Sequence, residues 1–137
     1  MEEFISDTVK INRNAESVFK LISDMSFFAQ AVSNAQIEDI EDFQSTQDIC
    51  SFKVKGVETG IRIIVREPNT TVKYTGYGYS PFEFFIWVQL KELAPDDTRL
   101  RIVLKAHLNL MMKTMFKGKI KKGLDKIVYQ LAEALNR

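Results

Sequence analysis

The sequence predicts an α+β domain in which a seven-stranded antiparallel sheet closes over a long C-terminal helix. Two patterns indicate this architecture. Apolar and polar residues alternate over residues 98–108, as they do in a half-buried strand. From Phe116 onward the apolar residues are three or four positions apart, as on one face of a helix, at Ile120, Leu124, Ile127, Leu131 and Leu135. A helix of this kind has to bury its apolar stripe, and the preceding sheet is the only large apolar surface available to it.

The N-terminal part predicts one strand followed by two short helices. Alternation indicates a strand at residues 4–11. Asn14 is a good N-cap, so a helix is expected over residues 15–23. Ser26 is placed to cap a second short helix that holds Phe27, Phe28, Ala31 and Val32.

The middle of the chain predicts six further strands, separated by short turn-like breaks such as Lys55-Gly56 and Pro68-Asn69. The expected strands are residues 37–43, 49–54, 57–67, 71–79, 82–93 and 99–108. Short breaks favour antiparallel neighbours, because a parallel pair needs a longer crossover connection. No composition shift or linker divides the chain, so residues 1–137 are expected to form a single domain.

Parity along the strands predicts which apolar side chains face the helix. They are Val57, Ile61, Ile63 and Val65 in a middle strand, and Leu100, Ile102, Leu104, Ala106 and Leu108 in the last. In the first strand, Ile5, Val9 and Ile11 share one parity. In the strand at 82–93, Phe84 and Ile86 share one face while Phe85 and Trp87 share the other. Phe85 and Trp87 are expected either to pack against side chains of the outer face or to form a homodimer contact.

The charge balance gives no reason to expect nucleic acid or an anionic membrane as a partner, because 19 Lys and Arg against 18 Asp and Glu leave a net charge of +1. The start of the last helix is nevertheless basic, and its lysines are interpreted as a solvated face. Cys50 is the only cysteine, which excludes an intramolecular disulfide. The first ten residues lack a signal-peptide pattern and no stretch approaches the roughly 20 apolar residues of a membrane span. The expected location is the cytoplasm, without integral membrane association.

Catalytic and metal-binding patterns are not found. One histidine, His107, and one cysteine are too few for the usual metal clusters, and no phosphate-cradling glycine loop is present. His107 shares a parity with Arg101 and Lys105, which indicates a surface histidine more than a catalytic base. We therefore expect no catalytic residue, no metal and no cofactor.

Residues 9–24 carry a family resemblance. A strand is followed by a helix start with small residues at Ala15 and Ser17, then by the pair Val18 and Phe19, and then by Asp24. This segment, with the order of elements along the whole chain, resembles the SRPBCC superfamily. That superfamily includes START-type lipid-transfer domains, polyketide cyclases and aromatases, and activators of the Hsp90 ATPase. The resemblance implies a helix-grip fold, in which a curved antiparallel sheet wraps around the C-terminal helix with an apolar cavity between them.

The expected function is noncatalytic binding of a small hydrophobic molecule or lipid in that cavity. The candidate lining residues are Ile61, Ile63, Tyr74, Phe84, Ile86, Leu104, Met112, Met115, Phe116 and Ile120. Met111, Met112 and Met115 are interpreted either as a flexible mouth or as ordinary core. Tyr74 is interpreted as core or as a hydroxyl that orients the ligand. The alternatives are a cyclase-like or aromatase-like enzyme in which Tyr74 moves a proton, and a protein-interaction module that uses Phe85 and Trp87.

Overall fold

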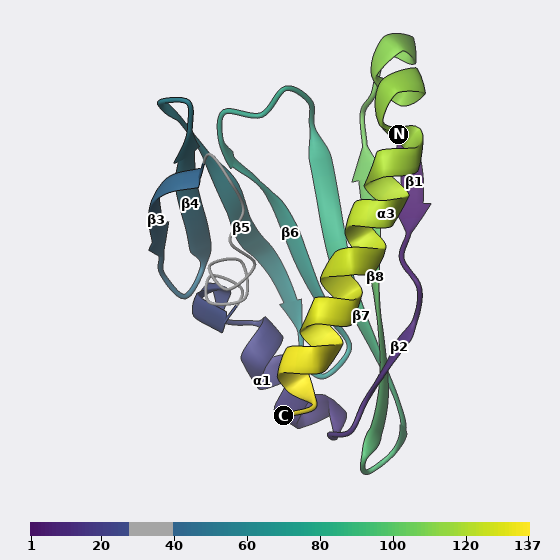
Figure 1. The fold of residues 1–137 in the computed structure, drawn as a ribbon. Coiled ribbons are helices and arrows are strands. Elements are labelled where there is room, and N and C mark those ends of the chain that lie inside the picture. Colours follow the sequence, from purple (N-terminus) through teal and green to yellow (C-terminus); the bar gives the residue numbers. More distant parts are fainter. Residues whose placement is uncertain (28–39) are drawn as a thin grey trace.

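The computed structural model describes residues 1–27 and 40–137, and over these residues it is an α+β fold with one antiparallel sheet and a long C-terminal helix (Figure 1). The strands are β1 (Glu2–Ile5), β2 (Val9–Ile11), β3 (Ile40–Ser45), β4 (Ile49–Val54), β5 (Val57–Glu67), β6 (Thr71–Gly78), β7 (Phe84–Ala94) and β8 (Asp97–Ala106). The helices are α1 (Ala15–Ile22) and α3 (Leu110–Leu135). The expected α+β, helix-grip architecture is therefore confirmed.

The prediction of a second short helix falls partly outside the described residues. Residues 25–27 are helical, so this helix begins before the Ser26 cap that the sequence predicts, and the Asp24 side chain accepts a hydrogen bond from the Ser26 amide at 2.9 Å. The predicted positions of Phe28, Ala31 and Val32, and the first residues of the strand expected at 37–43, lie outside the described part of the chain.

Strands β1 and β2 replace the single first strand that the sequence predicts. Both pair with β8, but the register moves by one residue between Ile5, which lies opposite Val103, and Val9, which lies opposite Leu100. The extra residue between Ile5 and Val9 reverses which side chains of β1 face the core. Phe4 packs against the core, whereas Ile5 is 38% exposed, so Ile5 does not share a face with Val9 and Ile11 as the alternation predicts.

Strands β8, β7, β6, β5 and β4 follow one another across the sheet, and β3 and β1 form its edges. One row of facing residues crosses it from Ile63 through Tyr74, Ile86 and Leu104 to Phe4. Four residues expected to line a ligand site thus lie side by side on one face. This register confirms the parity expected for Leu104 and Ile86.

A bulge in β5 corrects another expectation. The pairing of β5 with β6 shifts between Ile63 and Val65, and beyond the shift Val65 is 39% exposed. Val57, at the start of the strand, is 47% exposed. Ile63 is buried and Ile61 packs against the core, so only the middle of the predicted inward set faces the core.

Helix α3 begins six residues before Phe116, where the Asn109 side chain accepts a hydrogen bond from the Met112 amide at 2.8 Å. Its buried residues are Leu124, Val128, Leu131 and Leu135. Ile127, which the sequence placed in the stripe, is 46% exposed, and Val128 takes its place. From Ile120 to Leu135 the stripe therefore runs at intervals of four, four, three and four residues.

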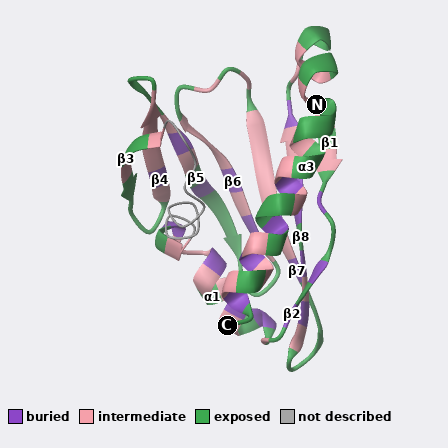
Figure 2. Ribbon diagram, in the orientation of Figure 1, coloured by how far each residue is buried: buried purple, intermediate pink, exposed green. Residues whose placement is uncertain are grey.

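The core lies under the C-terminal half of α3, where Val18, Ile22 and Met25 of the α1 region join the sheet and the helix. Figure 2 shows the contrast along α3, with buried residues confined to the half that ends beside α1. Among the described residues, no helix is long and apolar enough to cross a membrane.

Candidate functional site

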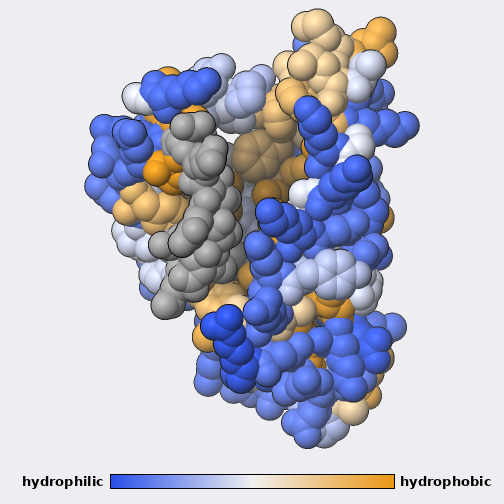
Figure 3. Space-filling model, viewed as in Figure 1, coloured by the Kyte–Doolittle hydropathy of each residue, from blue (hydrophilic) through white to orange (hydrophobic). Residues whose placement is uncertain are grey.

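The N-terminal half of α3 and the sheet face each other with apolar side chains that are only partly buried. On the sheet these are Ile61, Phe84, Ile86 and Leu104, and on the helix they are Met112, Phe116 and Ile120. The main chain of α3 comes closest to β1, β2 and β8, at one side of the sheet. Figure 3 shows a hollow beside α3 with apolar atoms on its floor. We call these seven residues the inner apolar face.

Phe84 has room on the sheet because its neighbours are small. A side chain at Gly76 would meet the Phe84 ring, since a Cβ there would lie 3.2 Å from Cε1 of Phe84. Ala106 lies opposite Phe84 on β8. The ring also has an edge-on contact with Phe82, with 6.0 Å between the ring centroids. The absence of a side chain at Gly76 therefore leaves the space that the Phe84 ring occupies.

Two of the ten candidate lining residues belong to the closed core. Ile63 is 8% exposed and Tyr74 is 2% exposed. The Tyr74 hydroxyl donates a hydrogen bond of 2.8 Å to the carbonyl of Ile22, the last residue of α1. Burial raises the pKa of the Tyr74 hydroxyl far above its usual value, so this group keeps its proton. Tyr74 thus attaches α1 to the sheet.

Met115 is not brought to the inner apolar face. It is 58% exposed and lies on the same side of α3 as Met111, Lys122 and Lys126, opposite the buried stripe. The other helix residues of the candidate set, Met112, Phe116 and Ile120, do turn toward the sheet side. Their intermediate burial is compatible with both interpretations of the methionine segment.

Sequence reasoning missed two aromatic residues that pack against the core from the sheet edges. Phe4 lies opposite Leu104, and Phe43 stacks on Phe52 with 6.1 Å between the ring centroids. Phe4 was missed because the one-residue shift in register between Ile5 and Val9 leaves no trace in the alternation of the sequence. Phe43 directly follows Glu41 and Asp42, and an aromatic residue beside two acidic ones was the signal that could have identified it.

A polar cluster fixes α3 against the junction of β1 and β2. The Asp7 carboxylate accepts hydrogen bonds from the Tyr129 hydroxyl at 2.8 Å and from Nζ of Lys121 at 3.1 Å. The Asp7 amide donates to Oδ1 of Asp125 at 2.7 Å, and Lys121 also contacts this oxygen at 2.9 Å. The bonds from Tyr129 and Lys121 lower the pKa of the Asp7 carboxyl. We call these four residues the Asp7 clamp.

The outer face of the sheet carries Phe85 and Trp87 under a cover of lysine side chains. Nζ of Lys73 lies 4.6 Å from the Phe85 ring centroid and 5.0 Å from that of Trp87, and Nζ of Lys105 lies 5.5 Å from Trp87. Both rings are half-buried. These contacts agree with packing on the outer face, and a homodimer contact through the two rings stays a prediction.

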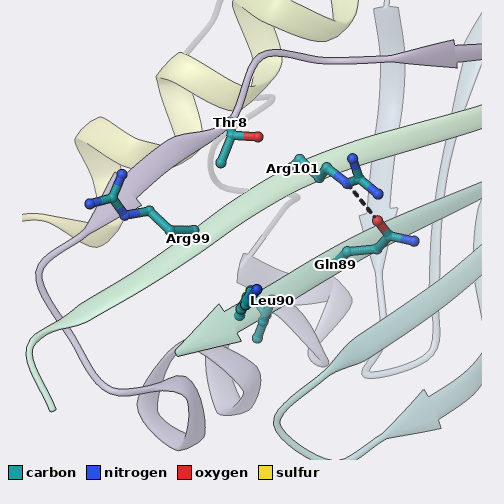
Figure 4. A pocket seen from close by; sticks show the side chains of 6 residues that line it. Thr8, Gln89, Leu90, Arg99 and Arg101 are labelled. Carbon is teal, nitrogen blue, oxygen red and sulfur yellow. Dashed lines mark hydrogen bonds between the residues drawn. The ribbon is translucent and has the colours of Figure 1, made fainter. Parts of the chain in front are cut away.

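A second concave region on the outer side of β7 and β8 is polar and basic. It has a volume of about 360 Å³ and is lined by Thr8, Gln89, Leu90, Lys91, Arg99 and Arg101. Figure 4 shows Arg101 bonded to Gln89, with 2.7 Å from Nε to the amide oxygen. Arg99 forms two hydrogen bonds with Asp97 and thereby lowers the pKa of that carboxyl. This lining does not suit an apolar ligand.

No group of three or more histidine, cysteine, aspartate or glutamate side chains within the described ranges is arranged to hold a metal ion. Cys50 is buried in the core, and burial raises the pKa of its thiol from 9.0 to about 11. His107, the single imidazole, is exposed.

Known proteins resemble this chain mainly in fold. A structure of a START superfamily protein from Mycobacterium smegmatis is 15% identical, with a TM-score of 0.65 over 97% of this chain and 96% of that one. The Aha1 dimer from Colwellia psychrerythraea is 17% identical, with a TM-score of 0.67 over 99% and 97%. Norcoclaurine synthase from Thalictrum flavum, in complex with a transition-state analogue, is 11% identical, with a TM-score of 0.73 over 98% and 91%.

No curated protein matches the sequence. One family model does, and it covers residues 4–132, which include every described element of the fold except the ends of β1 and α3. The match confirms the membership that residues 9–24 indicated. The chain belongs to the SRPBCC superfamily, in the family described as polyketide cyclase / dehydrase and lipid transport.

Proposed function

We propose that this protein binds a small hydrophobic molecule or a lipid between the sheet and the N-terminal half of α3, and that it does so without catalysis. The observation that carries the proposal is the difference between the two halves of the helix. Leu124, Val128, Leu131 and Leu135 are at most 6% exposed, whereas the inner apolar face remains partly accessible. Apolar side chains that face each other across a hollow favour an apolar occupant.

The energetics of burial support this assignment. Removing apolar surface from water contributes about 25 cal/mol per Å², so a ligand that covers the inner apolar face gains affinity in proportion to the area covered. The described lining is aliphatic, aromatic and thioether. Such a surface orients a ligand by shape more than by hydrogen bonds. A compact molecule with an extended apolar portion therefore fits better than a polar metabolite.

The family description supports the same class of ligand, because it includes lipid transport. Catalysis is the less favoured alternative. Its proton-transfer candidate, Tyr74, is buried and donates its hydroxyl to the Ile22 carbonyl. An interaction module or homodimer using Phe85 and Trp87 is the other alternative, and a structural relative described as the Aha1 dimer is the observation in its favour.

Native mass spectrometry of the gently purified protein, compared with its denatured mass, tests the proposal first. We expect an additional mass that is released on denaturation and is recovered by solvent extraction. Bare protein in this experiment is followed by titration with the fluorescent probe anilinonaphthalene sulfonate. A folded protein that neither carries an apolar molecule nor binds this probe contradicts the proposal.

Two substitutions then locate the site. Leu104→Gln and Ile120→Gln place a polar side chain on the inner apolar face, and each is expected to weaken probe binding about tenfold, since a buried amide without partners is costly. Ile64→Gln is the matched control, because Ile64 is 37% exposed. Circular dichroism verifies the fold of each variant. Unchanged affinity in folded Leu104→Gln and Ile120→Gln variants would place the probe elsewhere.

A further inference from the structure

The first turns of α3 expose three large apolar side chains close together. Leu110 is 80% exposed, Met111 69% and Met115 58%. Met111 and Met115 are four residues apart and therefore share one face of the helix. Isolated exposed apolar residues are ordinary, but three within six positions at one end of an element form a patch. We call these residues the α3 tip.

The α3 tip lies at the end of the molecule away from the closed core. Figure 1 shows the beginning of α3 at the opposite end from α1 and the C-terminus, and Figure 3 shows apolar atoms gathered at that end. Met112 and Phe116 of the inner apolar face lie in the same turns of the helix. A surface that received the α3 tip would therefore also lie beside the hollow.

The charged residues in the first half of α3 have one sign. The helix carries five lysines over residues 110–124 and no acidic residue. Lys113 is paired with Glu2, and Lys121 belongs to the Asp7 clamp. Within the described part of the chain, Lys117, Lys119 and Lys122 have no carboxylate within ion-pair distance. The patch thus combines exposed apolar side chains with an excess of positive charge, and of these three lysines Lys117 also acts electrostatically on the Glu2 carboxylate.

We propose that the α3 tip docks on an anionic lipid bilayer, with Leu110, Met111 and Met115 inserted among the acyl chains and Lys117, Lys119 and Lys122 against the headgroups. Apolar side chains next to lysines on one helix are the combination that holds a helix at a charged bilayer surface. This inference goes beyond the proposed function and does not depend on it, because docking requires no ligand in the hollow.

A second copy of the chain is a poorer occupant of the same patch. A two-fold contact through the α3 tip would bring the lysines of one copy toward those of the other, since the same patch is used on both sides. Like charges facing each other in an interface are unfavourable. An anionic bilayer accommodates both kinds of residue, because its acyl chains receive the apolar side chains and its headgroups attract the lysines.

Co-sedimentation with lipid vesicles tests the proposal. The full chain is mixed with vesicles of phosphatidylcholine alone and with vesicles of phosphatidylcholine and phosphatidylserine. We expect binding to the mixed vesicles that is at least about tenfold tighter than binding to phosphatidylcholine and that weakens as salt is added. Absence of binding to the mixed vesicles, or equal binding to both kinds, overturns the proposal.

Matched variants separate the α3 tip from general surface properties. Met111→Glu combined with Met115→Glu, and separately Lys117→Glu combined with Lys119→Glu, are each expected to weaken binding about tenfold or more. The controls are Leu93→Glu, because Leu93 is 54% exposed at the far end of β7, and Lys20→Glu combined with Lys91→Glu. The proposal is overturned if the control variants lose as much binding as the tip variants.

Site-directed labelling distinguishes insertion of the α3 tip from nonspecific adsorption of the protein to vesicles. Cys50 is buried, so a cysteine introduced by Met111→Cys is the accessible thiol for an environment-sensitive fluorophore. We expect its emission to shift to the blue with the mixed vesicles, and the emission of a Leu93→Cys label to stay unchanged. No shift at position 111, or a shift that appears with rising protein concentration in the absence of lipid, overturns the proposal.

Discussion

Ser6 shows how one hydroxyl decides the facing of a whole strand. Its Oγ accepts a hydrogen bond from the Ile102 amide at 2.8 Å and donates one to the Asp7 carbonyl at 2.8 Å. The Ser6 amide in turn donates to the Ile102 carbonyl at 2.9 Å. The side chain thus takes the place of a main-chain acceptor where β1 ends. Phe4 and Val9 can then both face the core although they are five residues apart.

Replacing Ser6 with alanine is expected to destabilise the protein by about 1–3 kcal/mol, because the buried Ile102 amide would lose its acceptor. Ser6 is only 5% exposed, so water cannot readily replace the hydroxyl. Urea denaturation measures the change. Ser45→Ala is the control, since Ser45 is an exposed residue of β3. A loss below about 0.5 kcal/mol would show that the β1–β2 junction does not depend on this hydroxyl.

At the scale of the element, α3 has polar contacts to the rest of the chain at its C-terminal end and in its middle, and fewer in its first turns. Its C-terminal end is bonded to the segment between β2 and α1, through Asn136 to the Asn12 amide at 2.6 Å and through Arg13 to the Leu135 carbonyl at 2.6 Å. The Asp7 clamp holds its middle. Among the described residues, the first turns have the Asn109 cap, the hydrogen bond from the Thr114 hydroxyl to the Leu110 carbonyl, and the pair of Lys113 with Glu2. The number of polar contacts that hold α3 to the rest of the chain therefore decreases toward the α3 tip.

The Asp7 clamp predicts a specific sensitivity to acid. The Asp7 pKa is lowered from its ordinary 3.8 in the folded protein, mainly by the hydrogen bond from Tyr129. The folded state therefore binds this proton less readily than the unfolded state does, and the stabilisation is present above pH 3.8 and lost as pH falls through the lower folded value. Asp7→Asn should be less stable than the natural chain at neutral pH, and the difference should shrink in acid.

Urea denaturation at a series of pH values measures this difference. Asp96→Asn is the control, because Asp96 lies in the exposed turn between β7 and β8. Lys121→Met in the Asp7→Asn background tests whether the two residues act together, since coupled residues give non-additive losses. A difference between Asp7→Asn and the natural chain that is constant with pH would assign the effect to something other than the Asp7 charge.

At the scale of the whole molecule, the fold is closed at one end and open at the other. Around α1 and the C-terminal half of α3 the side chains form a continuous core, and around the N-terminal half the inner apolar face and the α3 tip remain accessible. Both proposals concern the open end. A ligand would fill the hollow, and a bilayer would cover the apolar side chains beside it.

Hydrogen exchange should report this gradient directly. Amides of residues 124–135 are expected to exchange at least about tenfold more slowly than those of residues 114–119, although all belong to one helix, because local opening is easier where few buried contacts must be broken. Mass spectrometry of proteolytic fragments resolves the two segments. Equal protection along α3 would mean that its first turns are held as firmly as its last.

The sequence was informative wherever a pattern is local and regular. The alternation in β8 correctly identified Leu100, Ile102, Leu104 and Ala106 as inward residues, and helical spacing located most of the buried stripe of α3. It was misleading at Ile5 and Val65, because a bulge changes parity through hydrogen bonds to another strand. It also selected Ile127 over Val128, two adjacent apolar residues whose burial depends on how the helix is rotated against the sheet.

The candidate site divides in the same way. That Ile86, Leu104 and Ile120 are apolar residues facing the inside follows from period alone. Contacts between segments far apart in the chain decide the other assignments. They attach Tyr74 to α1, turn Met115 away from the sheet, and place Phe4 beside Leu104. The sequence by itself determined the class of fold and the set of inward apolar residues, since these depend on local spacing. Only the tertiary structure decided which of them close into core and which stay accessible, because burial depends on how far the helix lies over the sheet.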